Sequence, residues 1–153
     1  MLRLCLRFIF IVIINGCGQN NSAVKSVEDY KAAAHSVVKS IRVEDAIALK
    51  GDVIMVDVRE EEELDRSGVI PGAVHVPRGV LEFYIDPASA MHLEIFTSDR
   101  RMVFLCETGG RSLLATKVAI DMGVKKPLLL AGGFKAWAEA GGPVEQTAAA
   151  AKQ

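Results

Sequence analysis

The segment from Cys106 to Ser112, with the sequence CETGGRS, holds the residues whose types and spacing point most directly to chemistry. A thiol, two adjacent glycines and the guanidinium of Arg111 follow an apolar run and precede a segment with helical spacing. Glycines permit a tight backbone curl that turns successive N–H groups toward one point, and the next helix adds its positive end. These groups stabilise a thiolate, the form of cysteine that attacks. The segment therefore predicts that Cys106 is a nucleophile that handles an anionic sulfur or oxygen group.

Cys106 also has a simpler interpretation, in which it is a small apolar residue that ends a core strand, since free cysteines are often buried. The two glycines, the arginine and the helix start that follow it favour the nucleophile, because each of them serves an anion.

The elements around this loop alternate between strands and helices. Continuous apolar runs at 53–58, 102–105 and 128–130 predict strands that are covered on both faces, and 73–76 predicts a shorter strand. Helices are predicted at 24–39, 43–49, 60–67, 112–122 and 133–140. This order is typical of an α/β layered sheet, in which ligands bind beyond the carboxyl ends of the strands, where Cys106 lies.

Composition narrows the function classes. The chain has 153 residues, of which 50% are hydrophobic, and its net charge is -1, which predicts one domain with a sizeable core and no nucleic-acid partner. Three cysteines cannot build a disulfide scaffold, and neither they nor His35, His75 and His92 have metal-ligand spacing. No metal and no cofactor is therefore expected.

The N-terminus has the pattern of an export signal. Arg3 and Arg7 precede seven unbroken apolar residues, 8–14, a run much shorter than the about 20 residues that span a bilayer. The boundary at 14–17 resembles a bacterial lipobox, so residues 1–16 are predicted to be a lipoprotein-type signal peptide and Cys17 to carry the lipid. A buried apolar N-terminal strand is the alternative. We expect an exported, periplasmic protein with a membrane anchor, in which 17–39 form a tether and an N-terminal helix and 147–153 form a disordered tail.

Four ordered motifs carry a family resemblance. All four resemble parts of a single-domain rhodanese, a sulfurtransferase. The early strand of that family is matched by 53–60, its G-H-I-P-G-A segment by 68–77, its closing motif by 129–137, and the end of its domain by 141–144. Val69 stands where the family usually has histidine. The resemblance implies a rhodanese-like α/β domain over 40–146, with a mostly parallel sheet of about five strands flanked by helices. Residues 77–83 are most similar to a bacterial subgroup that includes periplasmic polysulfide sulfurtransferases.

The resemblance implies a mechanism. Cys106 would take a sulfane sulfur from a donor, hold it as a persulfide against the backbone of 107–111, and pass it to a thiol or cyanide. Four residues separate Cys106 from Arg111, which is the loop length of sulfur-handling members; related dual-specificity phosphatases have one residue more. A phosphatase or arsenate-reductase type of enzyme and a non-catalytic binding or sensing module remain as alternatives.

The remaining candidate site residues surround this loop. Substrate contacts are assigned to Glu107, Thr108, Gly109, Gly110 and Arg111 of the loop and to Arg59 and Arg78 outside it. Rhodaneses that use thiosulfate resemble one another in having a basic residue directly after the cysteine, whereas this chain has Glu107. The expected donor is therefore polysulfide or a small persulfide. Thr108 is expected either to donate its hydroxyl to the loop or only to stabilise it. Arg59 and Arg78 either guide a polysulfide chain or form structural ion pairs, Arg59 with Asp57 or with a glutamate of 60–63, which otherwise form a solvated helix face. The oligomeric state is left open.

Overall fold

The computed structural model describes residues 24–49 and 51–147 of the chain. The predicted signal peptide, the lipidation site at Cys17 and residues 148–153 of the predicted tail lie outside the described residues. Within the described part, no helix is both long enough and apolar enough to cross a bilayer.

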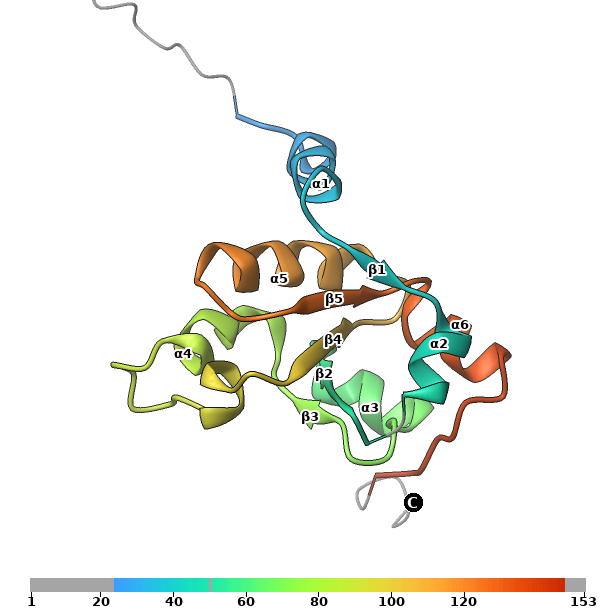
Figure 1. Cartoon of the computed structure of the whole chain (residues 1–153). Coiled ribbons are helices and arrows are strands. Elements are labelled where there is room, and N and C mark those ends of the chain that lie inside the picture. The colour runs from blue at the N-terminus through green and yellow to red at the C-terminus, as the bar shows by residue number, and fades with distance from the viewer. Residues whose placement is uncertain (1–23, 50, 148–153) are drawn as a thin grey trace, which may run out of the picture.

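A sheet of five strands forms the centre of the domain (Figure 1). The strands are β1 (Ser40–Ile41), β2 (Val53–Asp57), β3 (Val74–His75), β4 (Arg101–Leu105) and β5 (Pro127–Leu130). They lie in the order β1-β5-β4-β2-β3, and every pair is parallel. This confirms the predicted fold class. The sequence pattern located four of these strands but not β1, which has only two residues.

Helices connect the strands and cover both faces of the sheet. They are α1 (Val27–His35), α2 (Val43–Ala48), α3 (Glu61–Ser67), α4 (Leu81–Ile85), α5 (Gly110–Asp121) and α6 (Gly133–Glu139), with short 3-10 helices at Arg78–Val80 and Glu94–Thr97. Capping boxes fix where α1 and α3 begin: Ser26 pairs with Asp29, and Glu60 pairs with Glu63. The first helix is therefore shorter than the predicted 24–39, and α4 was not predicted at all.

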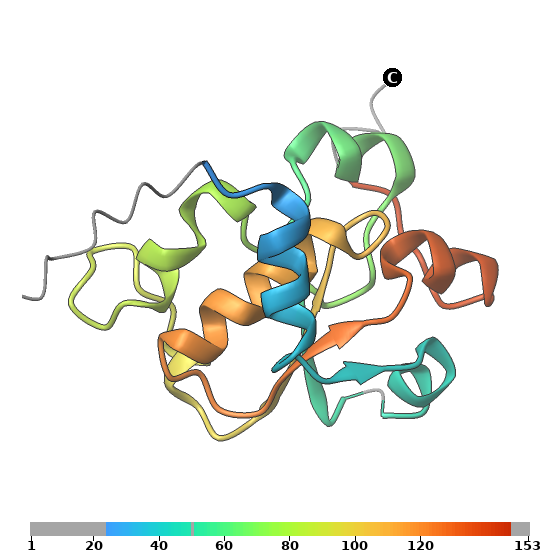
Figure 2. The ribbon, with the colours of Figure 1, turned by 90° about the horizontal axis from the view of Figure 1, so that it is seen from above.

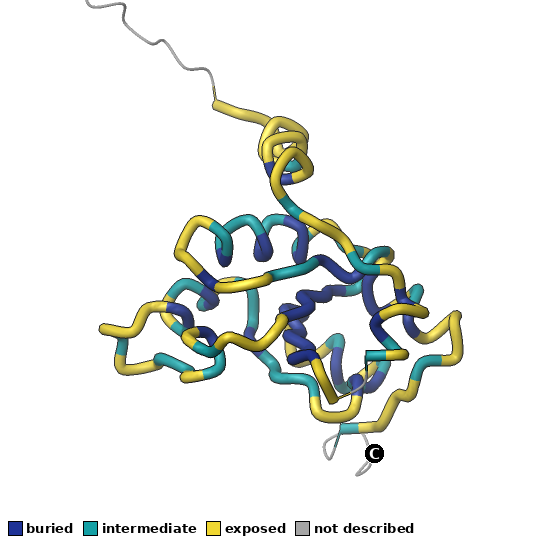
Figure 3. The backbone as a smooth tube through the Cα atoms, viewed as in Figure 1, coloured by how far each residue is buried: buried dark blue, intermediate teal, exposed yellow. Residues whose placement is uncertain are grey.

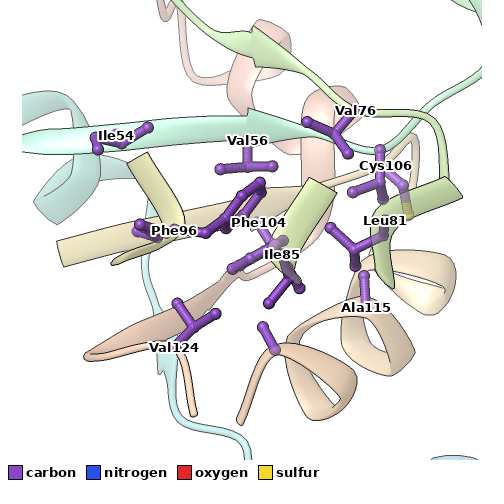
Figure 4. Close-up of a cluster of buried hydrophobic side chains, with 13 residues drawn as sticks. Ile54, Val56, Val76, Leu81, Ile85, Phe96, Phe104, Cys106, Ala115 and Val124 are labelled. Carbon is purple, nitrogen blue, oxygen red and sulfur yellow. The ribbon is translucent and has the colours of Figure 1, made fainter. Parts of the chain in front are cut away.

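Two hydrophobic clusters hold the helices on the sheet. Even-numbered residues of β2 and β4 pack with α4 and α5, whereas odd-numbered residues of the same strands pack with α2 and α6. This follows from the alternation of side chains along a strand, and it explains why both strands are uninterrupted apolar runs. Figure 4 shows the first cluster, with Cys106 at one end of it beside Val76 and Leu81.

Helix α1 lies on the outer side of α5, as the view in Figure 2 makes clear. Ala34 of α1 packs with Leu113 of α5 and Leu129 of β5 in a third small cluster. The rest of α1 is largely exposed, in contrast with the buried strands (Figure 3). A single buried contact face therefore fixes this helix against the domain.

Candidate active site

The loop after β4 starts at the carboxyl end of the middle strand of the sheet. Gly109 adopts a left-handed conformation with φ 104° and caps α5, so the loop reverses into the helix within four residues. The reversal brings donors onto the sulfur: the N–H groups of Gly109 and Ser112 lie 3.3 and 3.4 Å from Cys106 Sγ, and the Ser112 hydroxyl lies 3.4 Å from it.

The sulfur itself is nearly enclosed, because Cys106 is only 1% exposed. The thiol lies at the inner side of the loop, against the first hydrophobic cluster. Packing alone would give a buried cysteine no reason to receive three hydrogen bonds. Donors that converge on sulfur stabilise the thiolate or a charged persulfide, so the geometry favours the nucleophile over the structural interpretation.

Helix α6 holds the loop from the other side. The N–H of Phe134 donates to the Cys106 carbonyl (2.8 Å), and the N–H of Lys135 donates to the Glu107 carbonyl (3.0 Å). This close approach needs Gly133, whose φ is +66° and at which a Cβ atom would lie 2.3 Å from the Cys106 carbonyl oxygen. The first turn of α6 thus fixes the carbonyls of the loop and leaves its N–H groups for the sulfur.

Arg59 is a buried organiser of the site. Its guanidinium is fully buried and donates to Asp57 (2.6 Å), to the Ser67 hydroxyl (2.9 Å) and to the Gly68 carbonyl (2.9 Å). It also lies 3.8 Å from the centre of the Phe134 ring. Of the two interpretations from the sequence, the structure bears out the ion pair with Asp57. The guanidinium of Arg59 is enclosed by protein, and its assignment to substrate binding stays a prediction.

Arg111 is also engaged within the protein. Its guanidinium forms two hydrogen bonds of 2.6 Å with the Glu63 carboxylate. The Arg111 hydrogen bonds lower the pKa of Glu63 from 4.5 to about 2, and the same pair raises the pKa of Arg111. The prediction that 60–63 form a solvated helix face is therefore wrong for Glu63, because α3 directs this side chain toward Arg111 of the loop.

The other predicted contacts lie outward from the sulfur. Glu107 is 40% exposed, with its carboxylate 3.6 Å from the Arg59 guanidinium. Thr108 is exposed and makes no hydrogen bond within residues 24–49 and 51–147, so the predicted donation to the loop is absent. Arg78 pairs with Glu82, one turn further along the chain, at 3.1 Å. Of the predicted substrate contacts, the structure thus places only Gly109 at the Cys106 sulfur, and it leaves Arg78 in an ion pair on the surface.

Three contributors to the site were not identified from the sequence. Ser112 follows Arg111 in the first turn of α5, and this position was the available signal, since N–H groups of a first turn have no partner within the helix. Glu63 had no distinguishing signal within a run of four glutamates. Gly133 lies in the closing motif, but its contact with the loop is tertiary. In the described ranges, no cluster of His, Cys, Asp or Glu is suited to a metal ion.

A parallel α/β domain whose middle strand is followed by a cysteine enclosed by N–H donors has a site suited to negative charge on sulfur. The rhodanese-like domain family matches residues 42–140, and the chain belongs to this family. It is 30% identical to the human thiosulfate:glutathione sulfurtransferase over 100 residues, which are 61% of this chain and 86% of that protein. The family and this relative support sulfurtransferase activity in general.

Two solved structures extend the comparison. A protein of unknown function from Rhodopseudomonas palustris, described as a possible tyrosine phosphatase, is 42% identical, covers 84% of this chain and all of its own, and has a TM-score of 0.77. An alignment that covers 84% of this chain must include residues that precede residue 42, where the family match begins. A rhodanese-related protein from Thermoplasma volcanium is 27% identical, with a TM-score of 0.60 over 71% of this chain and 99% of its own.

Proposed function

We propose that this protein transfers a sulfane sulfur through a persulfide on Cys106. The observation that carries the proposal is the set of three donors, two N–H groups and one hydroxyl, at 3.3 to 3.4 Å from the sulfur. An enclosed site with fixed donors stabilises a localised negative charge better than water does. Family membership and a relative named as a sulfurtransferase support the same reaction.

Sulfur moves in two displacement steps. The Cys106 thiolate attacks the outer sulfur of a donor, a new S–S bond forms, and the donor leaves as its thiolate or as a polysulfide shorter by one sulfur. The terminal sulfur of the Cys106 persulfide then carries the negative charge. A thiolate or cyanide attacks this terminal sulfur, takes it, and releases Cys106 as a thiolate. The thiolate is the attacking form in both displacements, so neither step as proposed uses a general base.

Charges around the loop favour donors that bring little negative charge to the sulfur. Arg111 is paired with Glu63, and Arg59 is paired with Asp57 and faces Glu107. Two guanidiniums thus meet three carboxylates, so no cationic surplus is left for a compact dianion such as thiosulfate. A small persulfide has its charge at one end, and a polysulfide spreads its charge along the chain. We therefore assign these two classes as donors, with a thiol or cyanide as acceptor.

A phosphatase or arsenate-reductase type of reaction is the second candidate, because the similar protein from Rhodopseudomonas palustris carries the description of a possible tyrosine phosphatase. An oxyanion of that size needs the loop arginine as a ligand, and here Glu63 occupies Arg111 with both carboxylate oxygens. Hydrolysis of p-nitrophenyl phosphate that is lost in Cys106→Ser would favour this candidate over sulfur transfer.

Intact-mass spectrometry tests the proposal. The protein is incubated with polysulfide or cysteine persulfide, desalted and weighed, with Cys106→Ser as the matched control. We expect an adduct of about 32 Da, one sulfur atom, on the wild type alone, and its removal by cyanide. If no sulfane donor gives an adduct, the chain is a non-catalytic binding module. An equal adduct on both proteins would place the sulfur elsewhere.

The location of the protein belongs to the same proposal. We propose export and lipid attachment at Cys17, on the basis of the sequence pattern of residues 1–17. Metabolic labelling with palmitate tests this in cells that express the wild type or Cys17→Ser. Label in the membrane fraction of the wild type alone is the expected result, and an unlabelled wild type would refute lipidation.

A further inference from the structure

A hollow of about 440 Å³ lies between helix α1 and the outer side of the Cys106 loop. Residues from four segments line it, among them Lys31 and His35 of α1, Ser40 of β1, Thr108 and Gly109 of the loop, and Gly132 before α6. This volume is within the range of small-molecule sites. Gly109 belongs both to this hollow and to the site, since its N–H is the one 3.3 Å from Cys106 Sγ.

The wall formed by α1 is an addition to the family domain. The rhodanese-like match begins at residue 42, after α1 and β1. Ala34, fully buried against Leu113 and Leu129, fixes α1 on α5, and the capping box at Ser26 fixes its first turn. Lys31 and His35 are one helical turn apart, so both reach the same side of α1 and the same hollow.

The groups around the hollow suit an anion. Lys31 Nζ lies 3.0 Å from one oxygen of Glu28, which leaves further ammonium donors free. His35 is exposed, and its ring makes no hydrogen bond or ion pair with the described residues. Ser40 and Thr108, which carry hydroxyl groups, are also among the lining residues. No carboxylate is among the side chains that line the hollow.

We propose that this hollow binds the carboxylate end of a small thiol, or of its persulfide, during sulfur transfer. The inference rests on the proposed function and adds a site for the acceptor or donor beyond the family domain. A carboxylate placed between Lys31 and His35 holds the molecule against the loop that encloses Cys106. Cyanide and uncharged thiols have no such group and gain nothing from the hollow.

Acceptor selectivity tests the proposal in the full-length protein. The Cys106 persulfide is formed first, and its reaction with glutathione or with uncharged 2-mercaptoethanol is followed by intact mass. We expect the double variant Lys31→Ala/His35→Asn to react about tenfold more slowly with glutathione, as the loss of one or two charge-assisted contacts implies. Its reaction with 2-mercaptoethanol should stay within about twofold of the wild type. Lys25→Ala, which removes a nearby positive charge outside the hollow, is the control.

The proposal is overturned if both acceptors slow down equally, or if glutathione is unaffected. A binding measurement separates this inference from the proposed function. S-methylglutathione, which has no thiol, is titrated into the Cys106→Ser variant, and the histidine ring protons are followed by NMR. A saturable shift of the His35 signals, assigned with His35→Asn, is expected even if no persulfide forms in the wild type. Unchanged His35 signals at millimolar ligand would refute the site.

Discussion

Replacing Glu63 with glutamine keeps the size of the side chain and removes the charge that faces Arg111. The wild-type pair has two hydrogen bonds of 2.6 Å between a carboxylate that is 21% exposed and a guanidinium that is 39% exposed. A glutamine in the same place can offer only one oxygen as an acceptor. The variant therefore loses one charge-assisted hydrogen bond and leaves Arg111 without its counter-ion.

The pKa of Glu63 sets the size of the effect. Arg111 lowers this pKa from 4.5 to about 2, and the whole shift would correspond to about 3 kcal/mol of stability at neutral pH. Solvent screens a pair in which the guanidinium is more than a third exposed. We therefore expect the free energy of unfolding to fall by about 1 to 2 kcal/mol in Glu63→Gln.

The sign of the pH dependence follows from the lowered pKa. Because Glu63 is more acidic in the folded protein, its contribution is complete above about pH 5 and is lost as the pH falls from 4.5 toward 2. Urea denaturation, followed by the fluorescence of the single buried tryptophan, Trp137, measures the difference between wild type and variant. The difference should shrink steadily between pH 5 and pH 2.5.

Glu62→Gln is the matched control, since Glu62 is an exposed neighbour on the same helix, and it should change stability by less than about 0.5 kcal/mol. A difference between wild type and Glu63→Gln that stays constant with pH would refute the reasoning. So would an equal loss in the two variants.

Three further predictions concern the loop. Ser112→Ala removes the hydroxyl donor and should slow the alkylation of Cys106 by iodoacetamide at pH 7 by about tenfold. An unchanged rate would show that this hydroxyl does not stabilise the thiolate. Gly133→Ala should lower the free energy of unfolding, measured by urea denaturation, by more than about 3 kcal/mol, because the new Cβ atom collides with the loop backbone. Gly123→Ala is the control: Gly123 has φ +86° but open space around it, and the loss should be about 1 kcal/mol. Equal costs would contradict the close contact. Glu107→Gln should raise kcat/KM for thiosulfate by about fivefold and change that for cysteine persulfide by less than twofold; a parallel change with both donors would exclude the electrostatic account.

Much of the fold could be predicted because its signals are local. The strands β2 and β4 are covered on both faces, so burial leaves an unbroken apolar run in the sequence. Strand β1 has no such signal: its two residues, Ser40 and Ile41, become a strand only through pairing with Leu129 and Leu130 of β5. Pairing between segments so distant in sequence has no local pattern.

The site shows the same division. The position of Cys106 after a buried strand and before a helix could be predicted, since strand, glycines and helix start are adjacent in the chain. The partner of Arg111 could not be predicted, because a long side chain is directed by whatever lies across from it. Here the capping box of α3 decides which glutamate of the run faces the loop, and it selects Glu63.

The hydrogen bonds from α6 to the carbonyls of Cys106 and Glu107 have a consequence for biosynthesis. A ribosome completes β4 and the loop well before residues 133–135 emerge, and until then the carbonyls of Cys106 and Glu107 have no α6 amides to accept from. The carbonyls of the loop are therefore fixed only after residues 133–135 have been made. A fragment truncated before Gly132 keeps the cysteine and all five strands but lacks the two α6 amides that fix the loop carbonyls.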